Sequence, residues 1–304
     1  MIKKGLFMVI TLCIVASLIL FVQETDLRKS LEAIKSIGYR FYLLLLITFI
    51  AYLLGTLSWK YTLGNDVKKV SLKHLFLIRH VGETVAWFNP TSVIGGDALK
   101  GVLLAKYNID KRTVLVSVLV SRIIMILTQL SLLAISACYI LAKHPESIAG
   151  RFSVIKLSAF SISWIHKIEL IEKLKGLSRD LKSMLQDHSR ILTLSCGFAI
   201  LHWLVGSLEF YFILKFLGLK VSVLQALVVD LGVVIFKAAG AFIPGQLGVE
   251  EYGNKIMLLA IGIPGTEIWI SASIMRRARQ MMWAGFGVLV YLLYFHRKKS
   301  ALQT

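Results

Sequence analysis

Proline and cysteine are scarce in this sequence. Of its 304 residues only 4 are proline and 3 are cysteine. The cysteines, Cys13, Cys138 and Cys196, lie in apolar segments without CxxC or His–Cys ligand spacing. The sequence therefore predicts neither a disulfide framework nor a metal site. No HExxH pair and no GxxxxGK[ST] loop occurs, so we expect neither a catalytic metal nor an ATP-derived or other cofactor.

Acidic residues are also few, with 17 Asp and Glu against 35 Lys and Arg, which gives a formal net charge of +18. Such a charge could suit nucleic acid. The basic residues, however, lie between apolar runs, and no Gly/Ser linker or soluble domain is present on which they could form a groove. We therefore expect no nucleic-acid partner and interpret the charge as a signal of membrane topology.

Apolar residues are abundant, at 57% of the chain, and the mean hydropathy is +0.73. Runs without charge cover Gly5 to Val22, Phe41 to Trp59 and Ile123 to Ala142. Each matches the ~20 residues that a helix needs to cross about 30 Å of hydrocarbon. Lys3 and Lys4 precede the first run as in a signal peptide, but no small-x-small cleavage site follows it, so an uncleaved span is expected.

The distribution of lysine and arginine predicts the orientation, because positive segments stay on the cytoplasmic side. Lys3 and Lys4, the loop from Lys60 to Arg79 and the tail Arg297 to Lys299 are all basic. We expect both termini in the cytoplasm and the protein in the cytoplasmic (inner) cell membrane.

Two segments between the third run and Arg190 are ambiguous. The weakly apolar residues 148–165 include Arg151 and Lys156, and whether they cross the membrane stays open. Residues 166–190 carry apolar positions at helical spacing between charges. That basic segment fits a helix lying on the cytoplasmic membrane surface or one packed on the protein itself.

Later apolar segments cover Ile191 to Phe216, a broken stretch from Val221 to about Ile263, and Ile268 to Phe295. The predicted fold is an all-α polytopic integral membrane protein, with about six spanning helices and two re-entrant helical hairpins in an inverted-topology repeat. We treat 1–304 as one transmembrane domain, with a first hairpin unit at about 71–142 and a second at about 221–295.

A weak internal repeat supports those two units. Asp97, Ile109, Ser117 and Arg122 follow Pro90 at the same distances at which Glu251, Ile263, Ser271 and Arg276 follow Pro244. Few other positions are identical, so the weight lies on proline, acid and arginine, which are scarce here. The orientation derived from charge brings the chain to Pro90 from the inside and to Pro244 from the outside, as in transporters built from inverted repeats.

Proline lacks a backbone amide, and glycine allows a sharp turn, so each repeat is expected to form a hairpin. The residues assigned to the two turns are Pro90, Gly95, Gly96, Pro244, Gly245 and Gly248. Irregular backbone at membrane depth is tolerated only beside protein or water, so the hairpins should line an internal cavity.

The sequences "NPTSVIGGDALKGVLLAKY" with "SVLVSRII", and "FIPGQLGVEEYGNKIMLLAIGI" with "RRARQMM", resemble the lysylphosphatidylglycerol synthase membrane-domain family, the flippase-like domain. The resemblance extends over essentially the whole chain. It implies a polytopic domain with re-entrant segments that moves lipids between leaflets. The chain ends at Thr304 without the soluble aminoacyltransferase domain of fused members, so lysyl transfer is not expected. The motif positions are Pro90, Gly95, Gly96, Asp97, Arg122, Pro244, Gly248, Glu250, Glu251 and Arg276.

Arg122 lies too deep in its segment for a loop charge and needs a partner. An anionic lipid phosphate could supply it through paired hydrogen bonds, or Asp97 could neutralise it within the protein. Arg276 belongs to "RRAR", whose arginines could extend to the membrane interface and anchor the last helix. Its place in the repeat favours a functional role equally.

Acidic and further basic residues complete the candidate translocation site. Asp97, Glu250 and Glu251 could attract a cationic headgroup, bind a coupling proton, or cap the helix after each hairpin. Lys100, Lys237, Glu83 and Glu209 also interrupt apolar sequence and could line a groove for headgroups or form structural pairs. The lone histidines His80 and His202 show no ligand pattern.

The leading function hypothesis is translocation of a phospholipid or other lipid-linked substrate between leaflets, with membrane lipids as the main partners. A second is an integral-membrane enzyme of aminoacyl-phospholipid or glycolipid synthesis that uses Asp97 or Glu251 as acid or base. A third is an accessory subunit that binds lipid or a membrane enzyme. Homo-oligomerisation stays open.

Overall fold

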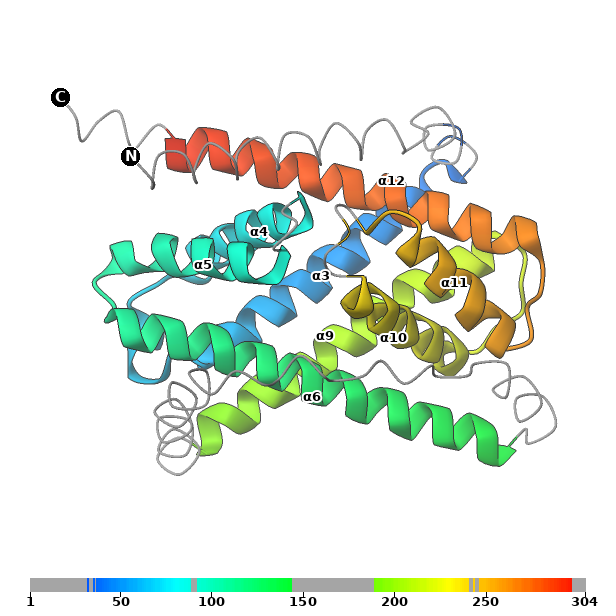
Figure 1. Ribbon diagram of the computed structural model, residues 1–304, viewed down its shortest axis with the longest axis horizontal. Helices are drawn as coiled ribbons and strands as arrows, with labels where there is room; N and C mark the ends of the chain where they lie inside the picture. Colours follow the sequence, from blue (N-terminus) through cyan, green and yellow to red (C-terminus); the bar gives the residue numbers. More distant parts are fainter. Residues whose placement is uncertain are drawn as a thin grey trace.

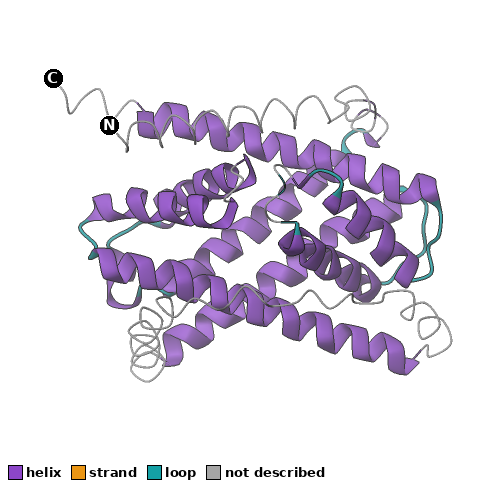
Figure 2. Ribbon diagram, in the orientation of Figure 1, coloured by secondary structure: helices purple, strands orange, loops and turns teal. Residues whose placement is uncertain are grey.

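A computed structural model describes residues 32, 35, 37–88, 92–143, 189–240, 243 and 246–296. Within these residues the chain is helical and contains no strand (Figure 2). The all-α fold class is thereby confirmed. The expected segments at 5–22, 148–165 and 297–299, nearly all of 166–190, and Pro90, Pro244 and Gly245 lie outside the described residues.

An antiparallel pair of long helices crosses the molecule: α3 (Arg40–Tyr61) and α9 (Ser189–Phe216) (Figure 1). At one end, the rings of Tyr61 and Phe198 stack with centroids 5.5 Å apart. At the other, the guanidinium of Arg40 lies 5.6 Å from the centroid of the Phe216 ring. The two helices therefore define a Tyr61 end and a Phe216 end of the molecule.

The first hairpin begins and finishes at the Tyr61 end. It consists of α4 (Leu72–Phe88) and α5 (Ser92–Leu104), preceded by the short helix η1 (Gly64–Lys68) and followed by η2 (Ala105–Tyr107). Lys69 Nζ, before α4, donates to the carbonyl of Asn108, after α5, at 3.3 Å. Next comes α6 (Lys111–Lys143), and Asp110 Oδ2 accepts hydrogen bonds from the Arg112 and Thr113 amides at its start.

The second hairpin begins and finishes at the Phe216 end. Its helices are α10 (Val223–Ala239), which starts with a Ser222–Gln225 capping box, and α11 (Val249–Ala260). Leu219 and Ile261, one before α10 and one after α11, pack on the same apolar cluster as Phe216. The unit continues into α12 (Thr266–Val290) and a π-helical turn, η4 (Tyr291–His296).

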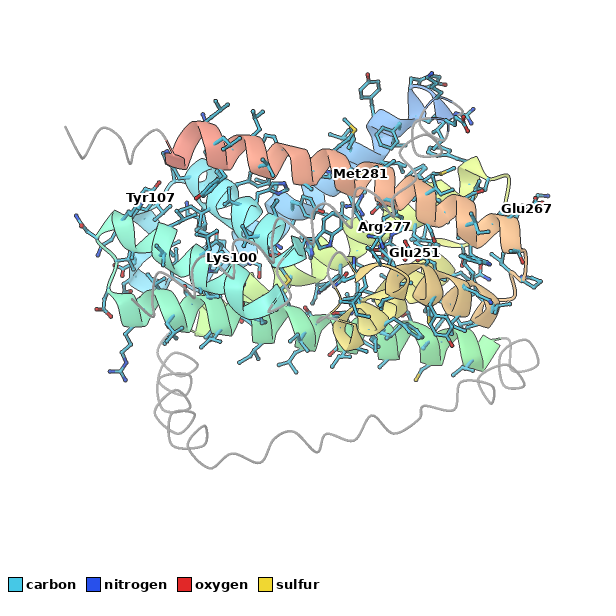
Figure 3. The ribbon with its side chains drawn as sticks, turned by 45° about the horizontal axis from the view of Figure 1, so that its top comes forward. Lys100, Tyr107, Glu251, Glu267, Arg277 and Met281 are labelled. Carbon is cyan, nitrogen blue, oxygen red and sulfur yellow. The ribbon has the colours of Figure 1, made fainter. Side chains whose placement is uncertain are left out.

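The two hairpins thus extend into the molecule from opposite ends, and both point toward its middle (Figure 1). Figure 3 shows Tyr107 of the first unit and Glu267 of the second near opposite ends, with Lys100, Glu251 and Arg277 between them. The depth of the hairpins in a bilayer and a true inverted repeat stay predictions.

Three described helices are long and apolar enough to span a membrane: Arg40–Tyr61, Arg112–Ala142 and Leu192–Phe216. They correspond to α3, α6 and α9 and match the predicted runs, with α6 extending about a dozen residues before the expected Ile123. The total of about six spans is not decided by these helices.

Of the glycines expected to form turns, Gly95 and Gly96 lie inside a helix, whereas Gly248 has a turn conformation. Gly95 and Gly96 lie within α5, and a Cβ on Gly96 would come 2.5 Å from the Gly82 carbonyl oxygen and 2.6 Å from Ala86 Cβ. Gly96 therefore lets α5 approach α4 closely. Gly248 does have a turn conformation, with φ of 77° at the N-cap of α11.

We predict that Gly96→Ala destabilises the protein by about 1–3 kcal/mol, because backbone atoms of α4 occupy the space of the added methyl group. Gly101→Ala in the same helix is the matched control, since its Cβ would meet only Val114 Cγ1 at 3.8 Å. It should be neutral or stabilising by about 0.5–1 kcal/mol. Thermal unfolding in detergent measures both, and equal transition temperatures for the two variants would contradict the packing argument.

Candidate functional site: a charged cavity between the hairpins

A cavity of about 530 Å³ lies in the middle of the molecule. Its wall includes side chains from α3, α4, α5, α6, α9, α10 and α12, together with Gln246 before α11. Both hairpins and the α3–α9 pair therefore contribute to one enclosure. That size is in the range of ~300–1,000 Å³ that is typical of small-ligand sites.

Positive charge exceeds negative charge on the cavity wall. The cationic side chains are Arg79, Lys100, Arg122, Lys237, Arg276 and Arg279, and the acidic ones are Glu83, Asp97 and Glu209. Three more acids, Asp230, Glu250 and Glu251, pair with arginines of α12 behind that wall. Charges at such depth are costly unless they are paired or meet a ligand.

Asp97 is the centre of the first hairpin's ion pairs. One carboxylate oxygen, Oδ2, lies 2.7 Å from both Nε and Nη2 of Arg122 on α6. The other, Oδ1, accepts a 3.1 Å bond from Lys100, whose ammonium also lies 2.6 Å from Glu83 on α4. The internal pairing of Arg122 with Asp97 is therefore present, and Arg122 keeps one third of its side chain exposed, at 33%.

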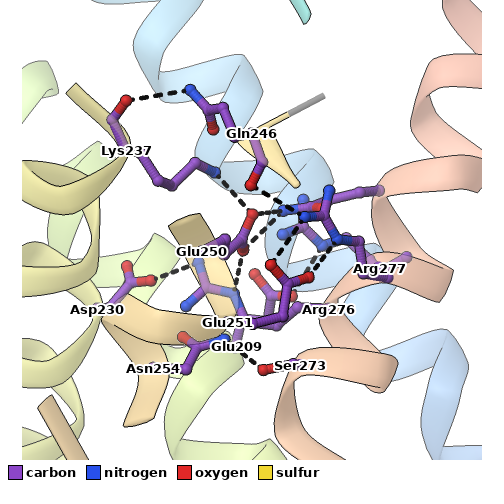
Figure 4. A network of polar contacts seen from close by, with 12 residues as sticks. Glu209, Asp230, Lys237, Gln246, Glu250, Glu251, Asn254, Ser273, Arg276 and Arg277 are labelled. Atoms are coloured by element: carbon purple, nitrogen blue, oxygen red, sulfur yellow. Dashed lines mark hydrogen bonds and ion pairs between the residues drawn. The ribbon is translucent and has the colours of Figure 1, made fainter. Parts of the chain in front are cut away.

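Glu250 is the centre of the second hairpin's network (Figure 4). Its carboxylate lies 3.1 Å from Arg276 Nε and 3.2 Å from Lys237 Nζ, and it accepts two bonds from Gln280. Arg276 Nη2 also lies 2.9 Å from Asp230 on α10. Nη1 of Arg276 has no hydrogen-bond partner within the described structure, although the residue is only 4% exposed.

Glu251 pairs with Arg277, which is not the arginine that matches Arg122 in the repeat. Arg277 Nε and Nη2 donate to its two carboxylate oxygens at 2.7 and 3.1 Å, and Nη2 also donates to the Gln246 carbonyl at 3.2 Å. The second hairpin therefore has no counterpart of the Asp97–Arg122 pair at the matching positions Glu251 and Arg276. Because neighbouring residues on a helix point about 100° apart, Arg276 faces α10 and Glu250 while Arg277 faces Glu251.

The third arginine of α12 connects the second unit to the α3–α9 pair. Arg279 Nε donates to Glu209 of α9 at 2.8 Å, and its Nη1 donates to the Tyr52 hydroxyl of α3 at 3.0 Å. Arg276, Arg277 and Arg279 are each buried, at 4–5% exposure. The alternative of an interface anchor made by "RRAR" is therefore wrong, because all three guanidinium groups have acidic partners inside the protein.

The two hairpins place charges of opposite sign at matching positions. Glu83 on α4 and Lys237 on α10 precede Pro90 and Pro244 by the same distance. Each bonds to the second helix of its own hairpin, Glu83 to Lys100 and Lys237 to Glu250. The two halves of the cavity thus share a layout but differ in charge.

The alternative that the acids cap helices fits Glu250 and Glu251 but not Asp97. Asp97 lies beyond the first turn of α5, and its side chain bonds only Lys100 and Arg122 within the described residues. Glu250 and Glu251 do lie in the first turn of α11, where they complement the helix dipole, yet both carboxylates also bond arginines of α12.

Several wall residues were missed or undervalued from the sequence. Arg79 was grouped with the basic loop, whereas it lies in α4 and lines the cavity. Asp230 was not singled out, although its position inside the apolar run of α10 was a signal. Tyr52 and Trp283 carry no sequence signal that separates them from ordinary apolar helix residues.

The histidines bond backbone carbonyls. His80 Nε2 lies 2.9 Å from the Trp283 carbonyl and His202 Nδ1 lies 2.6 Å from that of Ala51. Among the residues that the structure describes, no group of three or more His, Cys, Asp or Glu side chains could hold a metal ion.

Comparison with protein families identifies the class of protein. Residues 8–287 match the model of the lysylphosphatidylglycerol synthase TM region. The chain belongs to this family of membrane domains. Comparison with curated proteins and with solved structures gives no match.

We predict that Glu209→Ala destabilises the protein by about 3–5 kcal/mol, because Arg279 would remain buried without its carboxylate. The Glu209 and Arg279 side chains are 5% and 6% exposed. Asp66→Ala is the control, since it removes a pair with Lys69, whose side chain is 48% exposed. That change should cost less than about 1 kcal/mol. Denaturant titration in mixed micelles measures both, and a Glu209→Ala variant as stable as Asp66→Ala would disprove the role of the pair.

Proposed function

We propose that this protein translocates a phospholipid or other lipid-linked substrate between the leaflets of the cytoplasmic membrane, with the headgroup passing through the central cavity. The observation that carries the proposal is the charged enclosure between two opposed hairpins inside a family of lipid-related membrane domains. Its side chains can replace part of the hydration that a polar headgroup loses when it leaves water.

The outer surfaces of the helices suit the acyl chains. Large apolar side chains are exposed along α6 and α9, among them Leu115, Leu127, Ile135, Leu201 and Leu204. Lipid tails are as apolar as these side chains, so they could remain in the bilayer while the headgroup enters the cavity. Such a division of the substrate needs no large apolar pocket inside the protein.

The opposed hairpins supply a mechanism for access from two sides. The first begins and finishes at the Tyr61 end, and the second does so at the Phe216 end. Small tilts of one hairpin against the α3–α9 pair would open the cavity at one end while the other hairpin keeps it closed. Asp97 and Glu251, which an enzyme would use as acid or base, are both held in ion pairs, and this arrangement favours binding over proton transfer.

Lipid translocation is tested in liposomes that contain the purified protein and labelled lipids with different headgroups. Transfer should exceed that of empty liposomes for at least one lipid. Arg122→Gln should reduce it about tenfold or more, because Arg122 is the most exposed arginine of the cavity wall and its pair with Asp97 joins α6 to α5. The control is Lys68→Gln, which removes an exposed charge outside the cavity. Transfer no faster than in empty liposomes for every lipid would rule out the proposal.

Orientation is tested with single cysteines in a variant that lacks Cys13, Cys138 and Cys196. A cysteine at Lys68, before the first hairpin, should react with an impermeant thiol reagent from the cytoplasmic side. One at Lys220, before the second, should react from the opposite side, because the hairpins begin at opposite ends of the molecule. Labelling of both positions from the same side would contradict the opposed arrangement in the membrane.

A further inference from the structure

Arg79 differs from the other cations of the cavity wall. Lys100, Arg122, Lys237, Arg276 and Arg279 each have a carboxylate oxygen within 3.2 Å. The nearest carboxylate oxygen to Arg79 in the described structure belongs to Glu83 and is 4.0 Å away. In the described structure, its Nη1 donates a hydrogen bond to the backbone carbonyl of Tyr52, at 2.8 Å. A guanidinium has five N–H donors, so most of its capacity is not used by a carboxylate.

A glycine on the facing helix makes room for this guanidinium. Nη1, Nη2 and Cζ of Arg79 all lie where a Cβ on Gly55 of α3 would stand. The side chain is thereby held against α3 with only 15% of its surface exposed. Since χ freedom is lost in such a fixed position, the group is prepared to bind a ligand with little further ordering.

A second unmatched donor lies one helical turn from Gly55. Trp59 is 3% exposed and belongs to the cavity wall, and its indole Nε1 has no hydrogen-bond partner within the described structure. Residues four apart on a helix share a face, so Trp59 and the Arg79 guanidinium lie on the same side of α3. Buried donors without partners are costly, which makes an acceptor-rich ligand favourable here.

The acidic side chains of the wall, unlike Arg79, all have a close partner of opposite charge within the protein, which leaves less capacity to bind a cationic ligand. Glu83 lies 2.6 Å from Lys100, Asp97 lies 2.7 Å from Arg122, and Glu209 lies 2.8 Å from Arg279. Each is already matched by a cation of the protein. Arg79, whose nearest carboxylate oxygen in the described structure is 4.0 Å away, and the unmatched Trp59 donor near α3 therefore select for negative charge.

We propose that Arg79 is the seat for the phosphate of an anionic lipid headgroup, and that headgroups carrying additional ammonium groups are disfavoured. This inference rests on the proposed function for the route by which lipid enters, and it specifies the substrate class. The planar guanidinium grips two phosphate oxygens at once, which is stronger and more directional than a lysine contact. A lysine ester on the headgroup reverses the sign of its net charge and brings ammonium groups against Lys100, Arg122 and Lys237.

Direct lipid binding tests the seat. The purified full chain in detergent is titrated with phosphatidylglycerol, lysylphosphatidylglycerol and phosphatidylcholine of the same acyl chains, and bound lipid is quantified by native mass spectrometry. Phosphatidylglycerol should bind about tenfold or more tightly than the other two. Equal binding of all three lipids, or tighter binding of lysylphosphatidylglycerol, would overturn the proposal.

Variants assign the preference to Arg79. Arg79→Gln should lose the preference for phosphatidylglycerol, whereas Lys68→Gln, which removes an exposed charge elsewhere, should retain it. Gly55→Ala keeps the charge but displaces the guanidinium, and it should weaken phosphatidylglycerol binding in the same direction. If Arg79→Gln does not fold, Gly55→Ala alone tests whether the position of the guanidinium determines the preference. Its control is Gly197→Ala, which meets no atom within 4 Å. If both Arg79→Gln and Gly55→Ala kept the full preference for phosphatidylglycerol, Arg79 would not be the seat for the phosphate.

Competition and transport assays distinguish a free phosphate from an intact lipid as the ligand, and binding from translocation. Displacement of phosphatidylglycerol by glycerol phosphate, absent in Arg79→Gln, would show that the seat recognises the phosphate without acyl chains. Binding of the lipid alone, still dependent on Arg79, would identify the intact lipid as the ligand. Selective binding without translocation would overturn the proposed function and leave the seat in place. Translocation without any preference for anionic lipid would overturn the seat at Arg79 and leave the proposed function in place.

Discussion

Three buried arginines in one helix impose the main constraint on this structure. Arg276, Arg277 and Arg279 lie within a single turn of α12, where each guanidinium needs an acid to offset its lost hydration. The partners come from separate elements: Asp230 on α10, Glu250 and Glu251 on α11, and Glu209 on α9. Satisfying one short arginine cluster therefore fixes the second hairpin and the α3–α9 pair around α12. The cavity lies between these elements, the first hairpin and α6.

The first hairpin is held in a different way. Close backbone approach at Gly82 and Gly96 joins α4 to α5, while Asp97 joins α5 to α6 through a partly exposed arginine. Removing one member of an exposed ion pair costs less than removing one member of a buried pair, so the two sides of the cavity differ in their sensitivity to substitution. The first hairpin is thus attached to α6 through a partly exposed ion pair, whereas the second is attached to α12 through buried arginines.

Much of the fold follows from local sequence properties. Long apolar runs predicted α3, α6 and α9, and proline with nearby glycine marked the places where α4–α5 and α10–α11 are interrupted. Contacts between elements were harder to predict. Spacing alone could not decide whether Arg276 or Arg277 meets Glu251, because that choice depends on how α12 is rotated against α11. Arg79 was read as a loop charge because it follows a lysine-rich segment, although the helix that contains it starts at Leu72.

Gly55 has a consequence for how sequences of this family can vary. Its missing side chain is the space in which the Arg79 guanidinium lies, so a larger residue at 55 would displace the flexible end of an arginine at 79. A relative with alanine in place of the glycine would hold the arginine in another position, and one that loses the arginine would leave a gap that a methyl group could fill. The two positions lie on different helices, yet the residue at one limits the conformation of the side chain at the other. A substitution at either position would therefore change where the guanidinium lies in the cavity.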